Sequence, residues 1–189
     1  MKKEFGVKPY LFPMPVLMIA TYCEDGTVDV MNMAWGGICD DNLVALNISE
    51  SHKTAENLKR RGAFTLSIAD KAHLAEADFF GIASANKMPD KFARSGLHAV
   101  KSQHVDAPVV EEFPLTMECK VAELQHTATG FRVVGEIVNL LAEEAVLDEK
   151  GQIDPVKLNA IVFDPFQNGY YTIGKRVGQA WSSGAALTK

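Results

Sequence analysis

Short β-rich runs separated by turn residues dominate this sequence and limit the folds open to it. The run from Val16 to Cys23 is followed by Asp25 and Gly26, a pair typical of tight hairpin turns, and Val28 to Trp35 continues beyond it. Similar runs follow: Leu43 to Ile48, Phe64 to Ala69, Phe131 to Leu140, Ile161 to Phe163 and Tyr170 to Ile173. Such closely spaced strands predict a mainly β, antiparallel barrel, closed or partly closed, rather than an alternating βαβ sheet.

Few segments depart from this strand pattern. Ser51 to Arg61 predicts a helix that Gly62 ends, and Lys71 to Ala83 predicts a second helix. Pro89 to Ala93 predicts one further helical turn. We expect these helices to cover the open ends of the barrel.

A long strand is predicted from Leu115 onward. Apolar and mostly polar residues alternate along it, in the order Leu115, Thr116, Met117, Glu118, Cys119, Lys120, Val121 and Ala122. A period of two places one face of the strand in the core, so Cys119 is interpreted as a packing residue. Thr129 and Gly130 then predict a turn into the next strand.

Length, charge and cysteine content exclude several classes of protein. The 189 residues suit a single domain, 1–189, with a sizeable core. A formal net charge of -5 argues against a nucleic-acid partner. No apolar run approaches the ~20 residues that cross a bilayer, and no export signal is recognisable, so we expect a cytoplasmic protein without a membrane partner. The three cysteines lack the spacing of a redox pair, which predicts reduced thiols.

Common nucleotide and metal motifs do not fit. Gly169 to Lys175 matches the spacing of a phosphate-binding loop, but Arg176 replaces the required Ser or Thr and the segment predicts a strand followed by a tail. There is no Gly-x-Gly-x-x-Gly sequence. The loose group of His98, His104, Asp106 and Glu111 is interpreted as a solvated loop, so no metal site is predicted.

The segment from Asn47 to Asn57 remains as a candidate site. It brings amide and hydroxyl groups to the start of a predicted helix, and Lys53 adds a positive charge. Free backbone N–H groups and the helix dipole favour an anion there, and a phosphate would fit. Alternatively, Ser51 is only an N-cap and binds no ligand. The residues alone leave both interpretations open.

Several segments together resemble the flavin reductase-like FMN-binding family, near the flavoredoxins. They are, in chain order, Pro13 to Val16, Asp29 to Trp35, Asn47 to Ser49, His52 to Asn57, Asp78 to Ser84, Asp90 to Phe92, Asp106 to Pro108 and Gly135 to Val138. The similarity covers nearly the whole chain. Ala85 and the pair Met33 and Ala34 depart from the family pattern.

The resemblance implies a split β-barrel homodimer that binds FMN non-covalently. It implies these cofactor-binding residues: Asn32, Met33, Ala34, Trp35, Asn47, Ser49, Lys53, Thr54, Ser84 and Lys91. The first six would lie along the isoalloxazine ring, and Lys53 and Thr54 would hold the phosphate. The structural alternatives are a Lys91 on a solvated helix and a Trp35 that is only a rim or core aromatic.

The activity implied by the resemblance is an NADH- or NADPH-dependent flavin reductase that passes electrons to a partner protein or a small acceptor. No catalytic residue is assigned, because the flavin itself performs the difficult step. The alternatives are a flavoredoxin-type electron carrier and a split-barrel module for another ligand, such as haem. Residues 174–189 carry Trp181, and we expect this tail to dock on the barrel or on a partner subunit.

Overall fold

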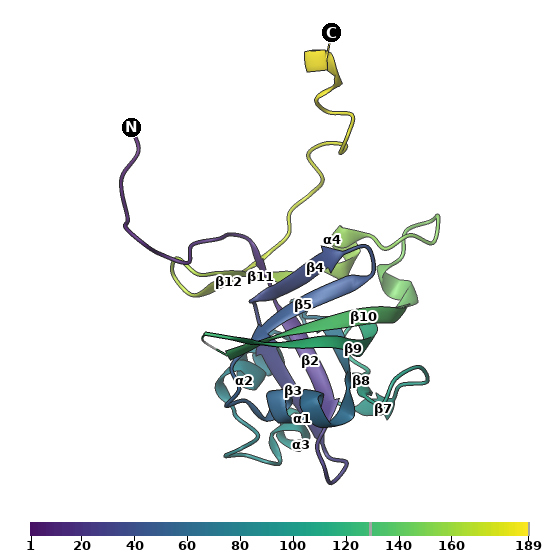
Figure 1. The fold of residues 1–189 in the computed structure, drawn as a ribbon. Coiled ribbons are helices and arrows are strands. Elements are labelled where there is room, and N and C mark those ends of the chain that lie inside the picture. The colour runs from purple at the N-terminus through teal and green to yellow at the C-terminus, as the bar shows by residue number, and fades with distance from the viewer. Residues whose placement is uncertain (129, 189) are drawn as a thin grey trace.

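The computed structural model describes residues 1–128 and 130–188. Its largest sheet has seven strands in the order β3-β2-β6-β9-β10-β5-β4, and all neighbouring pairs are antiparallel. The strands are β2 (Leu17–Tyr22), β3 (Val28–Met33), β4 (Gly36–Asp40), β5 (Leu43–Ile48), β6 (Ala63–Ile68), β9 (Leu115–Thr127) and β10 (Gly130–Ala142). The sheet curls into an open half-barrel (Figure 1). The predicted mainly β, antiparallel split barrel is confirmed.

Two smaller sheets complete the strands. One joins β1 (Met14–Pro15), β11 (Ile161–Asp164) and β12 (Gly169–Thr172), and the other joins β7 (Ala99–Lys101) and β8 (Pro108–Val110). The sequence did not predict β4, β7 or β8. β7 and β8 have only three residues each, too few to show a period, and β4 begins with two glycines that favour a loop.

The helices gather around β3 at one end of the half-barrel (Figure 1). They are α1 (Lys53–Arg61), α2 (Leu74–Ile82) and α3 (Lys91–Ser95). Three short helical segments lie later in the chain: the 3₁₀ turn η1 (Glu144–Val146), the helix α4 (Pro155–Leu158) and the 3₁₀ turn η2 (Ala185–Thr188). α1 starts two residues after the predicted start and ends, as predicted, at Gly62, whose φ of 64° is left-handed. No described helix is both long and apolar enough to cross a membrane.

The core has two parts, one on each side of β2. Leu17 and Ile19 belong to the cluster inside the curled sheet, while Met18 and Ala20 pack outward against a second cluster that contains Phe80 of α2. Because both faces of β2 are covered, the strand is apolar along most of its length rather than alternating. α2 is thereby fixed against the sheet next to β3.

β9 differs from the prediction of one buried face. Cys119 is fully buried, as predicted, and burial together with the nearby Glu118 carboxylate raises the pKa of the Cys119 thiol to about 12. Thr116 and Glu118, on the supposedly solvated face, are buried as well. The loop after β7 covers this face, and Ser102 donates a hydrogen bond of 2.5 Å to Glu118. The predicted turn residue Thr129 lies outside the described residues.

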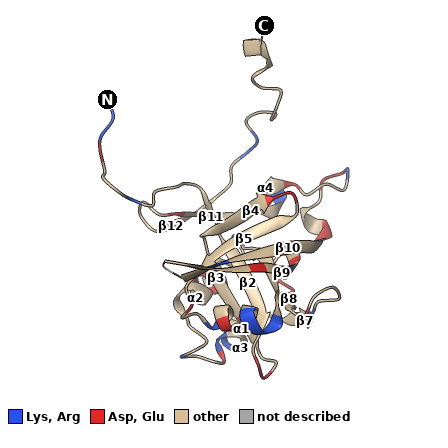
Figure 2. Ribbon diagram, viewed as in Figure 1, with Lys and Arg blue, Asp and Glu red and all other residues tan. Residues whose placement is uncertain are grey.

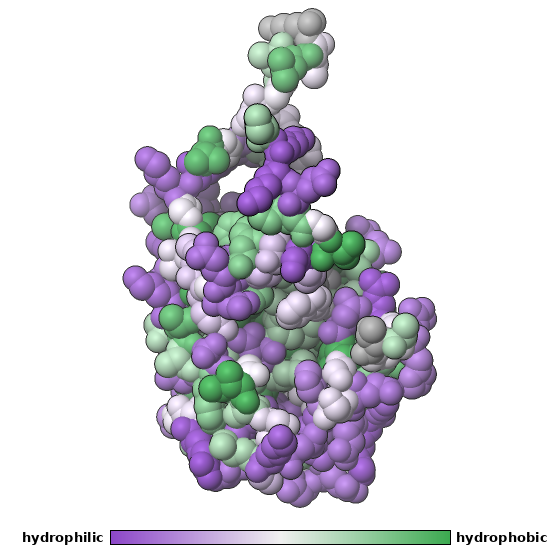
Figure 3. Space-filling model, turned by 90° about the vertical axis from the view of Figure 1, so that its left-hand side faces the viewer, coloured by the Kyte–Doolittle hydropathy of each residue, from purple (hydrophilic) through white to green (hydrophobic). Residues whose placement is uncertain are grey.

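Both ends of the chain extend away from the half-barrel (Figure 1). Apolar residues lie at the surface of the body and on the projecting C-terminal arm (Figure 3). Trp181 is fully exposed, as are Val177 and Leu187. The described tail residues are exposed throughout and do not pack on their own barrel, so the expectation that the tail docks on the barrel or on a partner subunit stays a prediction for the partner subunit.

Candidate functional site

The N-terminus of α1 opens onto a cavity of about 90 Å³, which we call the anion cavity. His52 is the N-cap of α1 and its side chain caps nothing, so the interpretation of Ser51 as the N-cap is wrong. Within residues 1–128 and 130–188, the N–H groups of Lys53 and Thr54 have no hydrogen-bond acceptor, as is usual in a first helical turn. These N–H groups and the helix dipole favour an anion.

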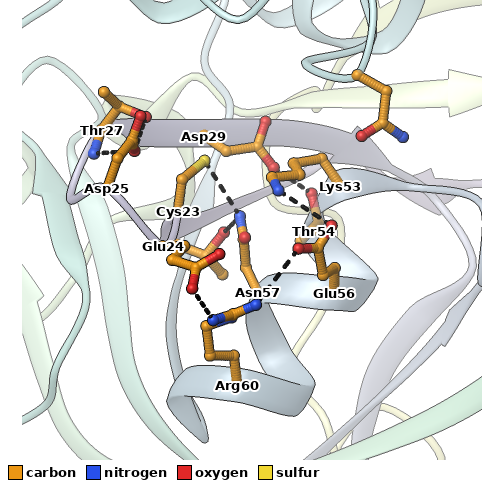
Figure 4. Close-up of polar contacts among 12 residues, drawn as sticks. Cys23, Glu24, Asp25, Thr27, Asp29, Lys53, Thr54, Glu56, Asn57 and Arg60 are labelled. Carbon is orange, nitrogen blue, oxygen red and sulfur yellow. Dashed lines mark hydrogen bonds and ion pairs between the residues drawn. The ribbon is translucent and has the colours of Figure 1, made fainter.

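A buried carboxylate lines the same cavity. Asp29 of β3 is fully buried, and its Oδ1 lies 2.8 Å from Nζ of Lys91. Its Oδ2 accepts a hydrogen bond of 2.7 Å from the Thr54 hydroxyl, which reaches toward it from α1 (Figure 4). Lys91 also donates to the carbonyl of Ala83, at 3.3 Å. Asp29 therefore joins β3, α1 and α3, and the interpretation of Lys91 as a solvated surface residue is wrong.

Lys53 brings a second ammonium group to the anion cavity. Its Nζ lies 3.0 Å from Oε2 of Glu56, and this hydrogen bond raises the pKa of Lys53. The side chain of Lys53 is 23% exposed and that of Glu56 is 50% exposed, whereas that of Lys91 is only 4% exposed. Exposed ion pairs are weak, so Lys53 can exchange Glu56 for an anion far more easily than Lys91 can leave Asp29.

A second hollow, of about 230 Å³, adjoins the anion cavity along β3. Asn32, Gly81 and Ile82 line both hollows, so the two lie side by side, and we call them together the groove. The second hollow, the wide end of the groove, continues along residues 33–35, and Trp35 is 53% exposed. Because β3 ends at residue 33 and β4 begins at residue 36, the two residues between them lie outside both strand ladders.

Asn47 and Ser49 lie beside the groove rather than in its lining. The backbone N–H of Asn47 donates to the carbonyl of Trp35 at 2.9 Å, and its side-chain Nδ2 donates to the same oxygen at 3.3 Å. The hydroxyl of Ser49 lies 3.0 Å from that of Ser51. Asn47 therefore holds the Trp35 backbone in place, and Ser49 orders the approach to α1.

The wide end also contains a polar pair that was missed from the sequence. The hydroxyl of Tyr170, on β12, donates to Oδ1 of Asp78, on α2, at 3.0 Å, and both residues line the hollow. Burial, reinforced by the Asp78 carboxylate, raises the pKa of Tyr170. Nearby, the side-chain amide of Asn32 donates to the carbonyl of Ala77 at 2.8 Å. No local signal points to Tyr170, because β11 and β12 bring it to α2 from the other end of the chain.

No described group of His, Cys, Asp and Glu side chains is arranged to hold a metal ion. The histidines of the loose group considered from the sequence instead face carboxylates of other segments. Nδ1 of His98 lies 2.7 Å from Oε1 of Glu112, and Nε2 of His104 lies 3.9 Å from Oε2 of Glu118.

Comparison with known proteins gives the family. Residues 10–160 match the family model of the flavin reductase like domain. The chain belongs to this family. Flavoredoxin of Desulfovibrio vulgaris (Miyazaki F) is 34% identical, with a TM-score of 0.92 over 97% of this chain and 100% of that chain. Flavoredoxin from Methanosarcina acetivorans is 23% identical, with a TM-score of 0.89 over 98% and 100%. An FMN-binding protein from Thermus thermophilus, with bound 1-cyclohex-2-enone, is 20% identical, with a TM-score of 0.77 over 95% and 98%.

In this flavin reductase-like chain, the groove gathers most of the residues singled out from the sequence. Those that line it are Asn32, Met33, Ala34, Trp35, Lys53, Thr54, Ser84 and Lys91. The flavin reductase-like resemblance is confirmed by the family match and by the flavoredoxin fold. Asp29 lies in one of the segments that resemble the family, yet the sequence does not indicate its role, because its two partners come from distant helices.

Proposed function

We propose that this protein binds FMN non-covalently in the groove and uses it to pass electrons from NADH or NADPH to a second acceptor, either a partner protein or a small molecule. The observation that carries the proposal is that the two hollows of the groove adjoin and share three lining residues. An anion cavity with free helix N–H groups and two ammonium groups lies next to a wider hollow with mostly apolar walls. FMN has the same two parts, a phosphate and a flat ring system.

The anion cavity fits the phosphate. Lys53 and the free N–H groups of Lys53 and Thr54 would bind it, and Ser84, which also lines the cavity, would offer a hydroxyl. The Thr54 hydroxyl hydrogen is used by Asp29, so Thr54 contributes its backbone N–H. Lys91 faces the same cavity, with its charge compensated by Asp29.

The wide end fits the ring. Asn32 to Trp35 would lie along the isoalloxazine, and the backbone of residues 34 and 35, which lies outside the strand ladders, would offer groups to the ring's pyrimidine side. Asn47 holds the Trp35 carbonyl, which fixes this stretch. Trp35 and Ile82 add exposed apolar surface to the lining of the hollow.

When bound, FMN supplies the chemistry of accepting hydride and releasing electrons. The chain holds and orients the cofactor and leaves part of the wide end open, which a nicotinamide needs. The fold shared with flavoredoxins and with an FMN-binding protein supports the same use of the groove. We assign no catalytic residue.

We also propose a homodimer. Three apolar side chains of the C-terminal arm, Val177, Trp181 and Leu187, are fully exposed on a single chain. An arm of this kind loses apolar exposure only by docking on another surface. We infer that a second copy of the chain provides this surface.

The visible spectrum of the purified protein, with its released cofactor identified, tests the proposal. We expect a yellow protein that releases FMN. A colourless protein that takes up no added FMN, or a haem spectrum, would contradict it. Steady-state oxidation of NADH and NADPH with free FMN as acceptor then separates the two activities, since a reductase turns over and an electron carrier does not.

A further inference from the structure

The anion cavity is electrically balanced without a ligand. Lys53 is paired with Glu56 at its edge, and Lys91 is paired with Asp29 inside it. The first pair is solvated, whereas both members of the second are almost completely buried. Only the first pair opens at low cost to admit a phosphate.

Asp29 lowers the affinity of the anion cavity for anions in three ways. Its carboxylate repels a phosphate that enters the cavity it lines. It neutralises Lys91, whose ammonium lies 2.8 Å away, and it takes the hydroxyl hydrogen of Thr54. A buried ion pair is rarely more stabilising than apolar residues of similar size, so stability alone does not explain a carboxylate at this position.

We propose that Asp29 is a positioning residue that holds Thr54 and Lys91 around the anion cavity and limits its affinity for phosphate, so that FMN stays exchangeable. This inference rests on the proposed function. If Asp29 were only a structural clamp, FMN binding would depend on it, and removing its charge would lower the affinity of the anion cavity for phosphate.

Asp29→Asn separates these two roles. The asparagine oxygen can accept from Lys91 while its amide donates to the Thr54 hydroxyl, which is then free to donate into the cavity. We expect the ratio of FMN affinity to riboflavin affinity to rise by about tenfold or more, with slower FMN dissociation. Riboflavin lacks the phosphate, so its affinity reports the ring end alone. An unchanged or lower ratio would overturn the inference.

Charge pairing gives a second test that does not depend on one variant. Lys91→Gln leaves the Asp29 carboxylate unpaired and should lower the FMN to riboflavin ratio, by about tenfold. The double variant Asp29→Asn with Lys91→Gln restores the balance of charge and should return the ratio to near that of the wild type. If all three variants lose FMN and riboflavin affinity alike, Asp29 is only a structural clamp.

Glu118→Gln is the matched control. Glu118 is an equally buried carboxylate that accepts hydrogen bonds from Ser102 and Asn139, but it does not line the groove. It should lower stability without changing the FMN to riboflavin ratio; a matching change would overturn the inference. If the wild-type protein binds neither flavin, the proposed function fails; if it binds FMN and Asp29→Asn shows no gain, only this inference fails.

Discussion

Replacing Lys53 by methionine removes one of the two cations of the groove, the one that pairs with an exposed carboxylate, Glu56. Methionine has a similar length and favours a helix, so α1 should be retained. A hydrogen bond to a charged group contributes about 1.5 to 3 kcal/mol. Binding first breaks the exposed Lys53–Glu56 pair, which offsets about 0.3 to 0.5 kcal/mol of this. The net loss is about 1 to 2.5 kcal/mol, which raises the Kd of FMN roughly 5- to 60-fold.

Titration of the apoprotein with FMN and with riboflavin, followed by flavin fluorescence, measures this effect. The Kd of riboflavin should not change, because riboflavin has no phosphate. Lys59→Met is the control on the same helix: Lys59 pairs with Glu50 and lies over the ring of Phe131, in the last turn of α1. An unchanged FMN Kd in Lys53→Met, or an equal loss in Lys59→Met, would refute the assignment of the phosphate to the N-terminus of α1.

The other predictions concern thiols, core and assembly. At pH 8 the exposed Cys39 should react rapidly with a thiol reagent and the buried Cys119 slowly. Ser variants of the cysteines that stay folded should keep their rate of FMN reduction. A collapse of that rate with FMN still bound would contradict the structural role of the thiols. The unfolded Cys119 thiol ionises at its ordinary pKa, whereas the folded thiol ionises only near pH 12. The free energy of unfolding should therefore be unaffected below the ordinary pKa and fall by about 1.4 kcal/mol per pH unit above it. Cys119→Ala should remove this slope in chemical denaturation at alkaline pH. Phe64→Ala should lower the free energy of unfolding by about 3 to 5 kcal/mol, because Phe64 is fully buried against Gly135; a loss below about 1 kcal/mol would contradict that packing. Deleting the chain from Gly178 onward should lower the dimer fraction in light scattering and loosen FMN; an unaltered mass and FMN affinity would refute the role of the tail.

The sequence predicted those parts of the fold that depend on local chemistry. The hairpin between β2 and β3 follows from Asp25 and Gly26. The positive φ of Gly26, 85°, suits a tight turn. The end of α1 follows from Gly62 in the same way. Where a second layer covers a strand, the pattern failed: Thr116 and Glu118 of β9 are polar yet buried. The Thr116 hydroxyl pairs with that of Ser67 on β6, and the loop after β7 brings Ser102 onto Glu118.

The candidate site was predictable only in part. Lys53 and Thr54 follow each other at a helix start, a signal that is local in the chain. The network around Asp29 is different, since it needs β3, α1 and α3 to meet, and a single sequence does not show which lysine will face that carboxylate. The densest positive charge in α1 does not mark the candidate site either. The last turn of α1 carries a continuous basic stretch, while the anion cavity lies at the opposite end of the helix (Figure 2).

A crystal structure of the protein reconstituted with FMN tests the central claim most directly. The phosphate should lie in the anion cavity, within hydrogen-bond distance of the backbone N–H groups of Lys53 and Thr54 and of Nζ of Lys53. The isoalloxazine should lie along residues 32–35, and the Asp29–Lys91 pair should remain closed. FMN bound with its phosphate outside this cavity, or with its ring away from Trp35, would contradict the account.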